Sequence, residues 1–278
     1  MICGNIWAKE LIVYPQPESE QDQRGVYAVE LLKLALAEAG VDAELRPAHI
    51  RMMQERALSE LKHGRTLDVV WTMTSDQREL DALPIRIPIY KGLIGWRIPL
   101  VHAQRAHLLA NVADLNDLKS FTAGQATDWP DTGILRANGL PVTTTSTYAN
   151  LFKMLTQGRF DYMPRSVVEV GHEARTTQAK SLVVDSHIVL HYPSAAYFFV
   201  NRHNAKLAQW IETGLEKAIS NGKFDRLFYK HHGKLIEQAN LKHRRVIRLD
   251  NPDLPKDTPL HRKELWLPFP DGKASATR

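Results

Sequence analysis

Arg78 is the residue whose type and position most directly suggest chemistry. It lies in RTLDVVWTMTSDQRELDALPIRIPIY (residues 65–90), which opens with an apolar run typical of a buried strand. The hydroxyls of Thr72, Thr74 and Ser75 follow that strand, and Ser75 is suited to be the N-cap of a helix. An arginine in the first helical turn opposes the helix dipole, and a capping box would place Glu or Gln there. This combination of hydroxyls and a helix-start arginine indicates that Arg78 binds an anion.

Arg165 is a second candidate cation, in the stretch GRFDYMPRSVVEV. If Arg78 and Arg165 face one another, they favour a di-anionic or phosphate-bearing molecule. Each arginine also has a simpler interpretation as half of an ion pair. Arg78 has Glu79 or Asp81 nearby, and Arg165 has Glu169 four residues on, a pairing of small value for stability.

The elements that must position Arg78 alternate between strand and helix. Apolar periodicity predicts strands and helices in turn at residues 11–14, 26–40, 41–45, 51–64 and 67–71. This order predicts right-handed crossover units and a mainly parallel sheet. The carboxyl ends of such strands share one edge, where ligands bind. Tyr14, the RPAH turn and the segment from Thr72 to Arg78 are therefore expected to converge.

A second unit of similar pattern begins near Leu115. Strands are expected at residues 121–123, 160–163, 183–184 and 188–190, with a helix over 148–157. An apolar segment at 195–202 and an amphipathic helix follow, and then a proline-punctuated tail. Two α/β units of one scheme indicate two lobes.

The ordered set of motifs resembles the type II periplasmic solute-binding proteins, specifically the polar amino-acid group of extracellular solute-binding family 3. The motifs are GRTLD before the third strand, SDQR, IRIPIY, a second GRFD, and YFFVNRHNAKLAQWIETGLEKAISNGKFDRLF followed by HHG. The resemblance covers residues 10–235. It implies two α/β lobes, each a mostly parallel mixed sheet flanked by helices, which are joined by two crossing strands and close on a trapped solute.

The resemblance also implies where the lobes lie in the chain. Lobe one is expected at residues 9–98 and 192–245, and lobe two at 99–191. The crossings are expected near GWRIPLVHA and HIVLHYPSAA. Residues 246–278 are expected to be a C-terminal extension that packs on lobe one or is partly disordered.

The resemblance gives site residues position by position. An arginine after the third strand binds the α-carboxylate of the solute in this group, and Arg78 matches it, with Thr72 and Thr74 as neighbouring hydroxyl donors. An aromatic residue after the first strand packs on the solute, and Tyr14 matches it. In lobe two the region after the first strand is GQATDWPDT, which makes Thr127, Asp128 and Trp129 candidates.

The sequence departs from the family at the residue that binds the substrate ammonium. The family often places an Asp five residues after the Asp of the GRFD motif, but Ser166 stands there, preceded by Arg165. Asp128 or Glu169 would have to replace that carboxylate, or else the solute is not an α-amino acid.

Aromatic and histidine residues have structural interpretations as well. Trp71, inside the apolar strand, is expected in the core, although it is also a candidate for solute contact. Trp129 is expected in the cleft. His231 and His232 are expected to cap a helix end. His187 and His191 share a strand face, but no third ligand is evident, so no metal site and no cofactor are predicted.

Composition restricts the class of protein. The chain of 278 residues is 44% hydrophobic and 24% charged, which is ordinary for a globular protein of about two domains. Its only cysteine, Cys3, excludes a disulfide framework. A net charge of +5 and the basic run LKHRRVIR indicate a solvated edge more than a nucleic-acid surface, because aromatic residues are not interleaved. No nucleic-acid partner is predicted, and a monomer is expected.

The beginning of the sequence, MICGNIWAKELIVY, has two interpretations. It matches the tail of a secretion signal whose start is missing, or it is an irregular beginning of a cytoplasmic protein. No run approaches the roughly 18 apolar residues of a membrane span. The resemblance implies a periplasmic location.

The predicted function is capture of a small polar, carboxylate-bearing solute, such as an amino acid or related organic acid, for delivery to an ABC-type importer through a membrane permease. No catalytic residue and no enzymatic activity are predicted. Two alternatives stay open: a dehydratase or lyase on the same scaffold with Asp128 and Glu169 as acid and base, and a ligand-sensing subunit of a membrane partner.

Overall fold

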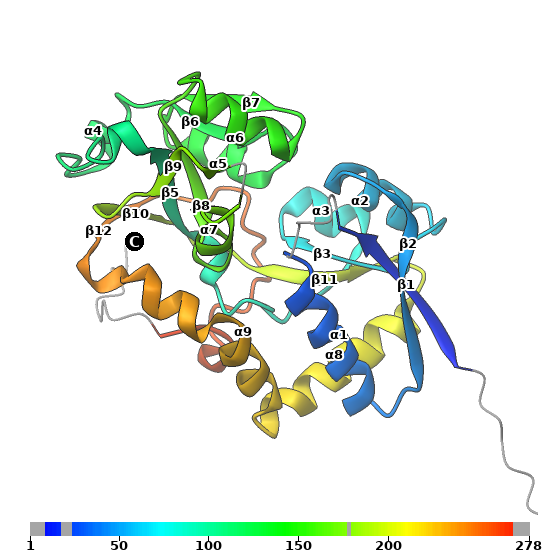
Figure 1. The fold of residues 1–278 in the computed structure, drawn as a ribbon. Helices are drawn as coiled ribbons and strands as arrows, with labels where there is room; N and C mark the ends of the chain where they lie inside the picture. Colours follow the sequence, from blue (N-terminus) through cyan, green and yellow to red (C-terminus); the bar gives the residue numbers. More distant parts are fainter. Residues whose placement is uncertain (1–8, 18–23, 177–178, 269–278) are drawn as a thin grey trace, which may run out of the picture. The chain divides into compact units, whose positions relative to one another are not determined.

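A computed structural model describes residues 9–17, 24–176 and 179–268. Residues 1–8, which include Cys3 and most of the segment for which a secretion signal was considered, lie outside this part. Its contacts divide the chain into two compact units (Figure 1). Unit 1 comprises Met1–Thr72, Asp76–Ile87 and Tyr197–His231, and unit 2 comprises Met73–Ser75, Pro88–Ala196 and His232–Arg278.

Unit 1 is built from two small sheets and the helices that follow their strands. Its elements are β1 (Glu10–Gln16), α1 (Val26–Glu38), β2 (Ala43–Arg51), α2 (Gln54–Lys62), β3 (Val69–Met73), α3 (Asp76–Asp81), β4 (Leu83–Ile85), β11 (Ala196–Val200), α8 (Ala205–Ser220) and the first half of α9 (Lys223–Ala239). β1 and β2 pair in parallel, and β3, β11 and β4 form the other sheet in that order. The predicted strand–helix alternation is confirmed in this unit.

Helices α1 and α8 pack closely in unit 1 because Gly214 has no side chain. A Cβ atom on Gly214 would lie 1.7 Å from the carbonyl oxygen of Ala35, so the two helix backbones touch there. The apolar faces of both helices are buried at Leu31, Leu32 and Leu215. Each helix thus contributes one stripe to the core of unit 1.

Unit 2 is built on one mixed sheet. Its elements are β5 (Trp96–His102), α4 (Leu115–Leu118), β6 (Ala123–Ala126), α5 (Pro130–Ala137), β7 (Val142–Thr145), α6 (Tyr148–Thr156), β8 (Tyr162–Ser166), α7 (Val167–Glu173), β9 (Leu182–Val184), β10 (Ile188–His191), β12 (Arg245–Arg248) and the second half of α9. The strand order is β12-β10-β5-β8-β6-β7, with β9 also on β5. β6 pairs in parallel with β7 and β8, whereas β5 runs antiparallel to β8 and β10.

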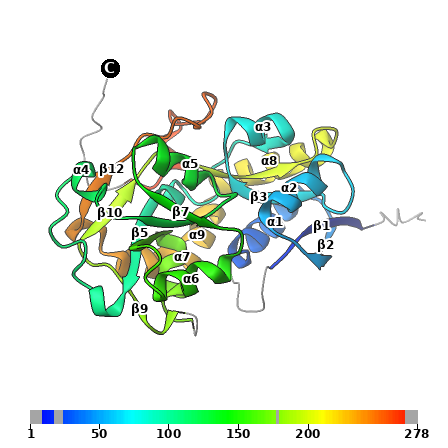
Figure 2. The ribbon, with the colours of Figure 1, turned by 90° about the horizontal axis from the view of Figure 1, so that it is seen from above.

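The two faces of the unit 2 sheet carry different helices. Ala123 and Tyr162 join the same buried cluster as Ile134 and Leu135 of α5. A Cβ atom on Gly124, the next residue of β6, would meet the ring of Phe160 on the opposite face. Figure 2 shows α5 and α6 on opposite sides of β7.

The C-terminal residues differ from expectation. Residues 246–278 were expected to pack on lobe one or to be partly disordered. The contacts place residues 246–268 in unit 2, where β12 pairs in parallel with β10, and residues 269–278 lie outside the described part of the chain. The boundaries also move: Pro88 already belongs to unit 2, and the second crossing falls between Ala196 and Tyr197. A further boundary lies inside α9, between His231 and His232.

Several elements extend further than the sequence predicted. β2 runs to Arg51 although it contains Pro47, and β8 runs to Ser166. The expectation that His231 and His232 cap a helix end is wrong, because α9 continues to Ala239.

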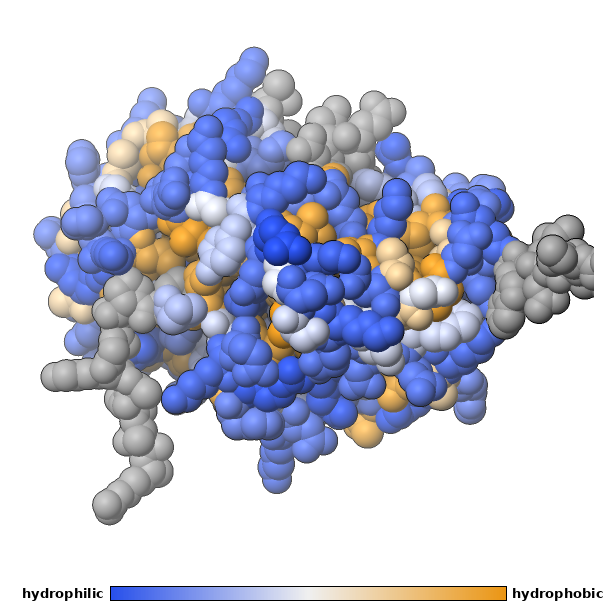
Figure 3. Space-filling model, turned by 90° about the horizontal axis from the view of Figure 1, so that it is seen from below, coloured by the Kyte–Doolittle hydropathy of each residue, from blue (hydrophilic) through white to orange (hydrophobic). Residues whose placement is uncertain are grey.

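The basic run LKHRRVIR is partly internal. Arg244 donates to the carbonyl oxygens of Ala239 and Asp185, and Arg245 donates to that of Val112. Both side chains therefore tie together parts of unit 2. On the surface, the face drawn in Figure 3 is mainly hydrophilic with hydrophobic residues interspersed. No helix within the described ranges is long and apolar enough to cross a bilayer.

Candidate functional site

Arg78 lies in unit 1, where two neutral side chains hold its guanidinium. One terminal nitrogen, Nη1, donates to Oγ1 of Thr72 at 2.5 Å, and the other, Nη2, donates to Oε1 of Gln54 at 2.6 Å. Arg78 is 9% exposed and Thr72 is 5% exposed, so the guanidinium is largely withdrawn from bulk water. The two carboxylates considered as its surface partners also bind other groups: Glu79 accepts from Arg86, and Asp81 accepts from Lys62.

An aromatic pair occupies the same unit. The ring centroids of Tyr14, near the end of β1, and Trp71, in β3, lie 6.0 Å apart. Trp71 also meets Phe198 of β11 edge to face and covers Gly25, but it is only half-buried. Burial raises the pKa of the Tyr14 hydroxyl. Trp71 therefore packs against other residues of unit 1 without being fully buried in its core as expected, and its contact with a solute stays a prediction.

The residues of unit 1 can bind a carboxylate. A guanidinium has five N–H donors in a planar fork, and its contacts to Thr72 and Gln54 fix its plane. Tyr14 and Trp71 supply flat apolar surface in the same unit. Four predicted residues, Tyr14, Trp71, Thr72 and Arg78, are thus brought into one unit by the ends of β1 and β3.

Thr74 has a different setting from Thr72. It is 2% exposed and belongs to unit 2, where its backbone N–H donates to the carbonyl oxygen of Ala195 at 2.8 Å. Its role as a hydroxyl donor to a solute stays a prediction.

In unit 2 the candidates Thr127, Asp128 and Trp129 form the turn between β6 and α5. Thr127 is exposed and its backbone N–H donates to the carbonyl oxygen of Thr145 at 3.0 Å, while Asp128 and Trp129 are half-buried. Trp129 precedes Pro130 at the start of α5, where proline is favoured. The turn lies at the carboxyl end of a parallel strand, as the sequence predicted.

Arg165 is fully engaged in an internal ion pair. Its Nε and Nη2 donate to the two carboxylate oxygens of Glu173 at 2.8 and 2.7 Å, and Nη2 lies 3.1 Å from Glu169. The guanidinium carbon is 4.4 Å from the ring centroid of Trp129, and the whole side chain is 1% exposed. The predicted pair with Glu169 is thus confirmed, but it is buried, not exposed, and Glu173 is the closer partner. Contact between Arg165 and a solute stays a prediction.

Ser166 supports the helix that follows β8. Its hydroxyl accepts from Val168 N–H and donates to the carbonyl oxygen of Leu93, while Glu169 accepts from the Ser166 N–H. This is a capping box at the start of α7. The position where the family often has an ammonium-binding Asp therefore carries a helix cap.

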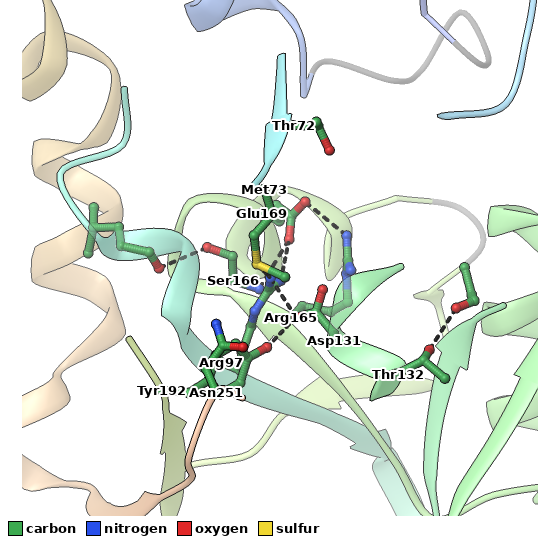
Figure 4. A network of polar contacts seen from close by, with 12 residues as sticks. Thr72, Met73, Arg97, Asp131, Thr132, Arg165, Ser166, Glu169, Tyr192 and Asn251 are labelled. Carbon is green, nitrogen blue, oxygen red and sulfur yellow. Dashed lines mark hydrogen bonds and ion pairs between the residues drawn. The ribbon is translucent and has the colours of Figure 1, made fainter. Parts of the chain in front are cut away.

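A second buried arginine, Arg97, lies beside the Arg165 ion pair, and Figure 4 shows both arginines with Asp131 and Glu169. Arg97, at the start of β5, lies 2.6 Å from Asp131 of α5 and 3.4 Å from Glu169 of α7. The Tyr192 hydroxyl donates to Asp131. Glu169 therefore links the Arg97 and Arg165 pairs into one cluster, which we call the buried ion network (Arg97, Asp131, Arg165, Glu169, Glu173 and Tyr192).

The carboxylates of the buried ion network raise the pKa of its two arginines. Burial alone would lower the pKa of each arginine, but the carboxylates outweigh it: Glu169 and Glu173 raise the pKa of Arg165, and Asp131 raises that of Arg97. Two guanidiniums and three carboxylates meet in the interior, so both arginines stay charged. The network fixes β5, β8, α5 and α7 to one another.

The sequence did not indicate several residues of these sites. Gln54 is the first residue of α2, after β2, and a position at the carboxyl end of a parallel strand could have singled it out. Arg97, Asp131 and Glu173 gave no local signal, because their partners lie on other elements. Within the described residues, no group of three potential metal ligands is present. His191, one of the two histidines considered for a metal site, lies against Trp96, with ring centroids 4.1 Å apart.

Solved structures of solute-binding proteins share this fold. An ancestral arginine-binding protein bound to arginine matches with a TM-score of 0.60 and 16% identity, over 80% of this chain and 98% of the other. A histidine kinase sensor domain with similarity to periplasmic binding proteins matches with a TM-score of 0.59 and 21% identity, over 81% of this chain and 96% of the other. An ancestral amino-acid-binding protein, a precursor of cyclohexadienyl dehydratase, matches with a TM-score of 0.58 and 15% identity, over 81% and 95%.

Comparison of sequences alone gives no relative. No model of a protein family matches the chain, and no curated protein matches it. The structural likenesses show the fold: the chain has the two-lobe α/β fold of the type II periplasmic binding proteins.

Proposed function

We propose that this protein is an extracytoplasmic solute-binding protein. It captures a small polar solute with a carboxylate, an amino acid or a related organic acid, by hinge closure of its two lobes, and delivers it to an ABC-type importer. The observation that carries the proposal is the buried Arg78 guanidinium, held by Thr72 and Gln54 in the unit that also contains the Tyr14–Trp71 pair.

Arg78 is the residue expected to select the solute. A charge-assisted hydrogen bond to a carboxylate contributes about 1.5–3 kcal/mol, and a planar guanidinium accepts both carboxylate oxygens at once. The similar fold of a protein that binds arginine, an α-amino acid with a free carboxylate, supports this class of solute.

The internal ion pairs of Arg165 restrict the class of solute further. Two facing arginines would favour a di-anion, but the Arg165 guanidinium is bound by Glu173 and Glu169. The solute is therefore expected to carry a single carboxylate, bound by Arg78. Thr127, Asp128 and Trp129, on the turn before α5, remain the proposed contacts from unit 2, and Asp128 is the proposed partner for an ammonium group.

A ligand-sensing subunit is the second candidate function. It is favoured by the 21% identity and shared fold with a histidine kinase sensor domain. Binding chemistry is the same in both cases, and the two functions differ in the membrane partner that reads the liganded state.

The proposal is tested by a thermal-shift screen of the twenty L-amino acids, common dicarboxylates and the carboxamides of the amino acids. At 100 times its dissociation constant, a solute raises the free energy of unfolding by about 2.7 kcal/mol, which gives a clear shift of the melting temperature. Arg78→Lys keeps the charge but loses the planar fork, and Arg78→Ala loses both. We expect dissociation constants for the best carboxylate to rise at least about tenfold in both variants, or about 1.4 kcal/mol.

Arg65→Ala is the matched control, because Arg65 is an exposed arginine of unit 1 that lies near Glu60 and precedes β3, at the end of that strand away from Arg78. It removes the same charge and should leave binding unchanged. Equal affinity of the parent protein and both Arg78 variants would contradict the carboxylate assignment. Chromatography of the recovered solute separates a binder from an enzyme, since a binder returns it unaltered.

A further inference from the structure

We propose that Gln54 is a positioning residue that holds the Arg78 guanidinium for a carboxylate while adding no charge to the site. This inference rests on the proposed function, because it concerns the solute that Arg78 binds. Gln54 does not itself have to touch the solute.

The geometry gives Gln54 a direct hold on Arg78. Nη2 of Arg78 donates to Oε1 of Gln54 at 2.6 Å, and Nη1 donates to Thr72 at 2.5 Å. Contacts to both terminal nitrogens fix the guanidinium at two points, so it cannot rotate about its Nε–Cζ axis or swing about its long stem without losing one of them. A charged group fixed before binding loses less conformational entropy when the solute arrives.

The fold places Gln54 where it can do this. β1 and β2 are parallel neighbours, with Tyr14 opposite Pro47, so their carboxyl ends share an edge. α2 begins at Gln54, three residues after β2 ends at Arg51. The side chain of its first residue therefore reaches Arg78 from a separate element, 24 positions away in the sequence.

The chemistry of an amide is what matters here. The oxygen of glutamine accepts a hydrogen bond but carries no net charge, whereas a glutamate at the same position would form an ion pair with Arg78. That ion pair would compete with the carboxylate of the solute for the same guanidinium. The neutral side chain of Gln54 thus favours an anionic solute.

The experiment compares two ligands in three variants. The ligands are the tightest-binding carboxylate from the screen above and its carboxamide, and their dissociation constants are measured by calorimetry. Gln54→Glu keeps an accepting oxygen but adds a charge, and Gln54→Ala removes the contact. Gln157→Glu is the control, because Gln157 is exposed and follows α6 in unit 2, so it adds the same charge elsewhere.

We expect Gln54→Glu to lower the preference for the carboxylate over the carboxamide at least about tenfold, or about 1.4 kcal/mol. Gln54→Ala should weaken carboxylate binding about threefold to tenfold, with a smaller effect on the carboxamide, and Gln157→Glu should change neither ligand.

Three results would overturn the inference. If Gln54→Glu weakens both ligands equally, Gln54 has only a structural role. If Gln157→Glu changes the preference as much, the effect is one of overall charge. If the Gln54 variants bind as the parent does, Arg78 needs no such support, although the proposed function stands. The proposed function itself fails if the parent protein binds none of the carboxylates, and the inference then fails with it.

Discussion

At the scale of single residues, two buried tyrosine hydroxyls in unit 2 have opposite settings. The hydroxyl of Tyr192 donates to Asp131 within the buried ion network. The hydroxyl of Tyr162 is buried and has no hydrogen-bond partner among the described residues. Both rings belong to the same apolar cluster, so packing is comparable and the hydrogen bond is the main difference. A buried polar group without a partner costs about 1–3 kcal/mol.

The first prediction follows from this difference. Tyr162→Phe should raise the free energy of unfolding by about 1 kcal/mol, because it removes a buried hydroxyl that gains nothing. Tyr192→Phe should lower it by about 1.5–3 kcal/mol, because it takes a donor from a buried carboxylate. Urea denaturation measures both, with the exposed Tyr229→Phe as a neutral control. Changes of the same sign in the two buried variants would refute the prediction.

The second prediction concerns alkaline pH. Burial raises the pKa of both Tyr162 and Tyr192 above the usual value of about 10. Above pH 10 the unfolded chain releases these phenolic protons while the folded chain keeps them. The stabilisation is therefore complete below about pH 10 and is lost as the pH rises, by up to about 1.4 kcal/mol per pH unit for each tyrosine.

Urea denaturation between pH 9 and 11 checks this dependence. The double variant Tyr162→Phe/Tyr192→Phe should lose stability less steeply over that range than the parent protein. Parallel curves for the two proteins would show that other groups cause the loss.

At the scale of elements, the segment just before β5 and the segment just after β10 touch through their backbones. The Tyr192 N–H donates to the Gly95 carbonyl oxygen at 3.2 Å. A Cβ atom on Gly95 would lie 2.1 Å from the carbonyl oxygen of Tyr192. Glycine is required there by the close approach of two chain segments. Gly95 lies soon after the chain enters unit 2 at Pro88, and Tyr192 lies shortly before the chain leaves unit 2 after Ala196.

The third prediction is that Gly95→Ala lowers the free energy of unfolding by about 1–3 kcal/mol, because the added methyl forces the two segments apart. Gly133→Ala is the matched control. Gly133 lies inside α5, where a Cβ atom would have its nearest contact at 3.4 Å, and alanine favours a helix by about 1 kcal/mol. Thermal unfolding of both variants measures the effects, and equal destabilisation would contradict the steric argument.

The sequence predicted the bounds of some helices well and those of others poorly. Helices α1 and α6 follow the 3.6-residue apolar period and were predicted close to their observed bounds. α9 was predicted too short because HHG looks like a helix end, yet Gly233 is tolerated inside the helix. Local pattern predicts such elements well and fails where packing overrides a residue's preference.

The site was predictable only where a motif or a short spacing gave a signal. Arg165 and Glu169 are four residues apart on the chain, so their pairing could be anticipated. Arg97 and Asp131 are 34 positions apart and sit on a strand and a helix. Their pairing depends on the order of strands in the sheet, which no local pattern specifies.

At the scale of the whole chain, residues 249–268 form an extension of unit 2 that we call the C-terminal strap. It begins beside β10, where the Leu249 N–H donates to the His191 carbonyl oxygen. It continues to Asn251, whose side-chain amide donates to the carbonyl oxygen of Pro193. It ends on the segment before β5, where Lys91 Nζ donates to the Glu264 carbonyl oxygen at 2.7 Å.

The end of the strap covers a strained turn. Lys91 and Gly92 both have positive φ values, of 49° and 79°. The Trp266 ring packs over Gly92, so that a Cβ atom there would lie 2.7 Å from it, and the Leu267 N–H donates to the Lys91 carbonyl oxygen at 2.9 Å. A non-glycine residue with positive φ is costly, and the strap supplies contacts that hold it in place.

The last prediction tests the strap through local stability. Trp266→Ala removes the ring from Gly92 and the indole hydrogen bond to the Pro259 carbonyl oxygen, so amide hydrogens in residues 89–96 should exchange at least about tenfold faster, or about 1.4 kcal/mol. Exchange in α1 and α8 should not change, because both helices belong to unit 1. Trp210→Ala, in α8, is the matched control and should have the reverse pattern. Equal acceleration in both units would mean that Trp266 supports the fold as a whole, and unchanged exchange at 89–96 would mean that the turn holds without the strap.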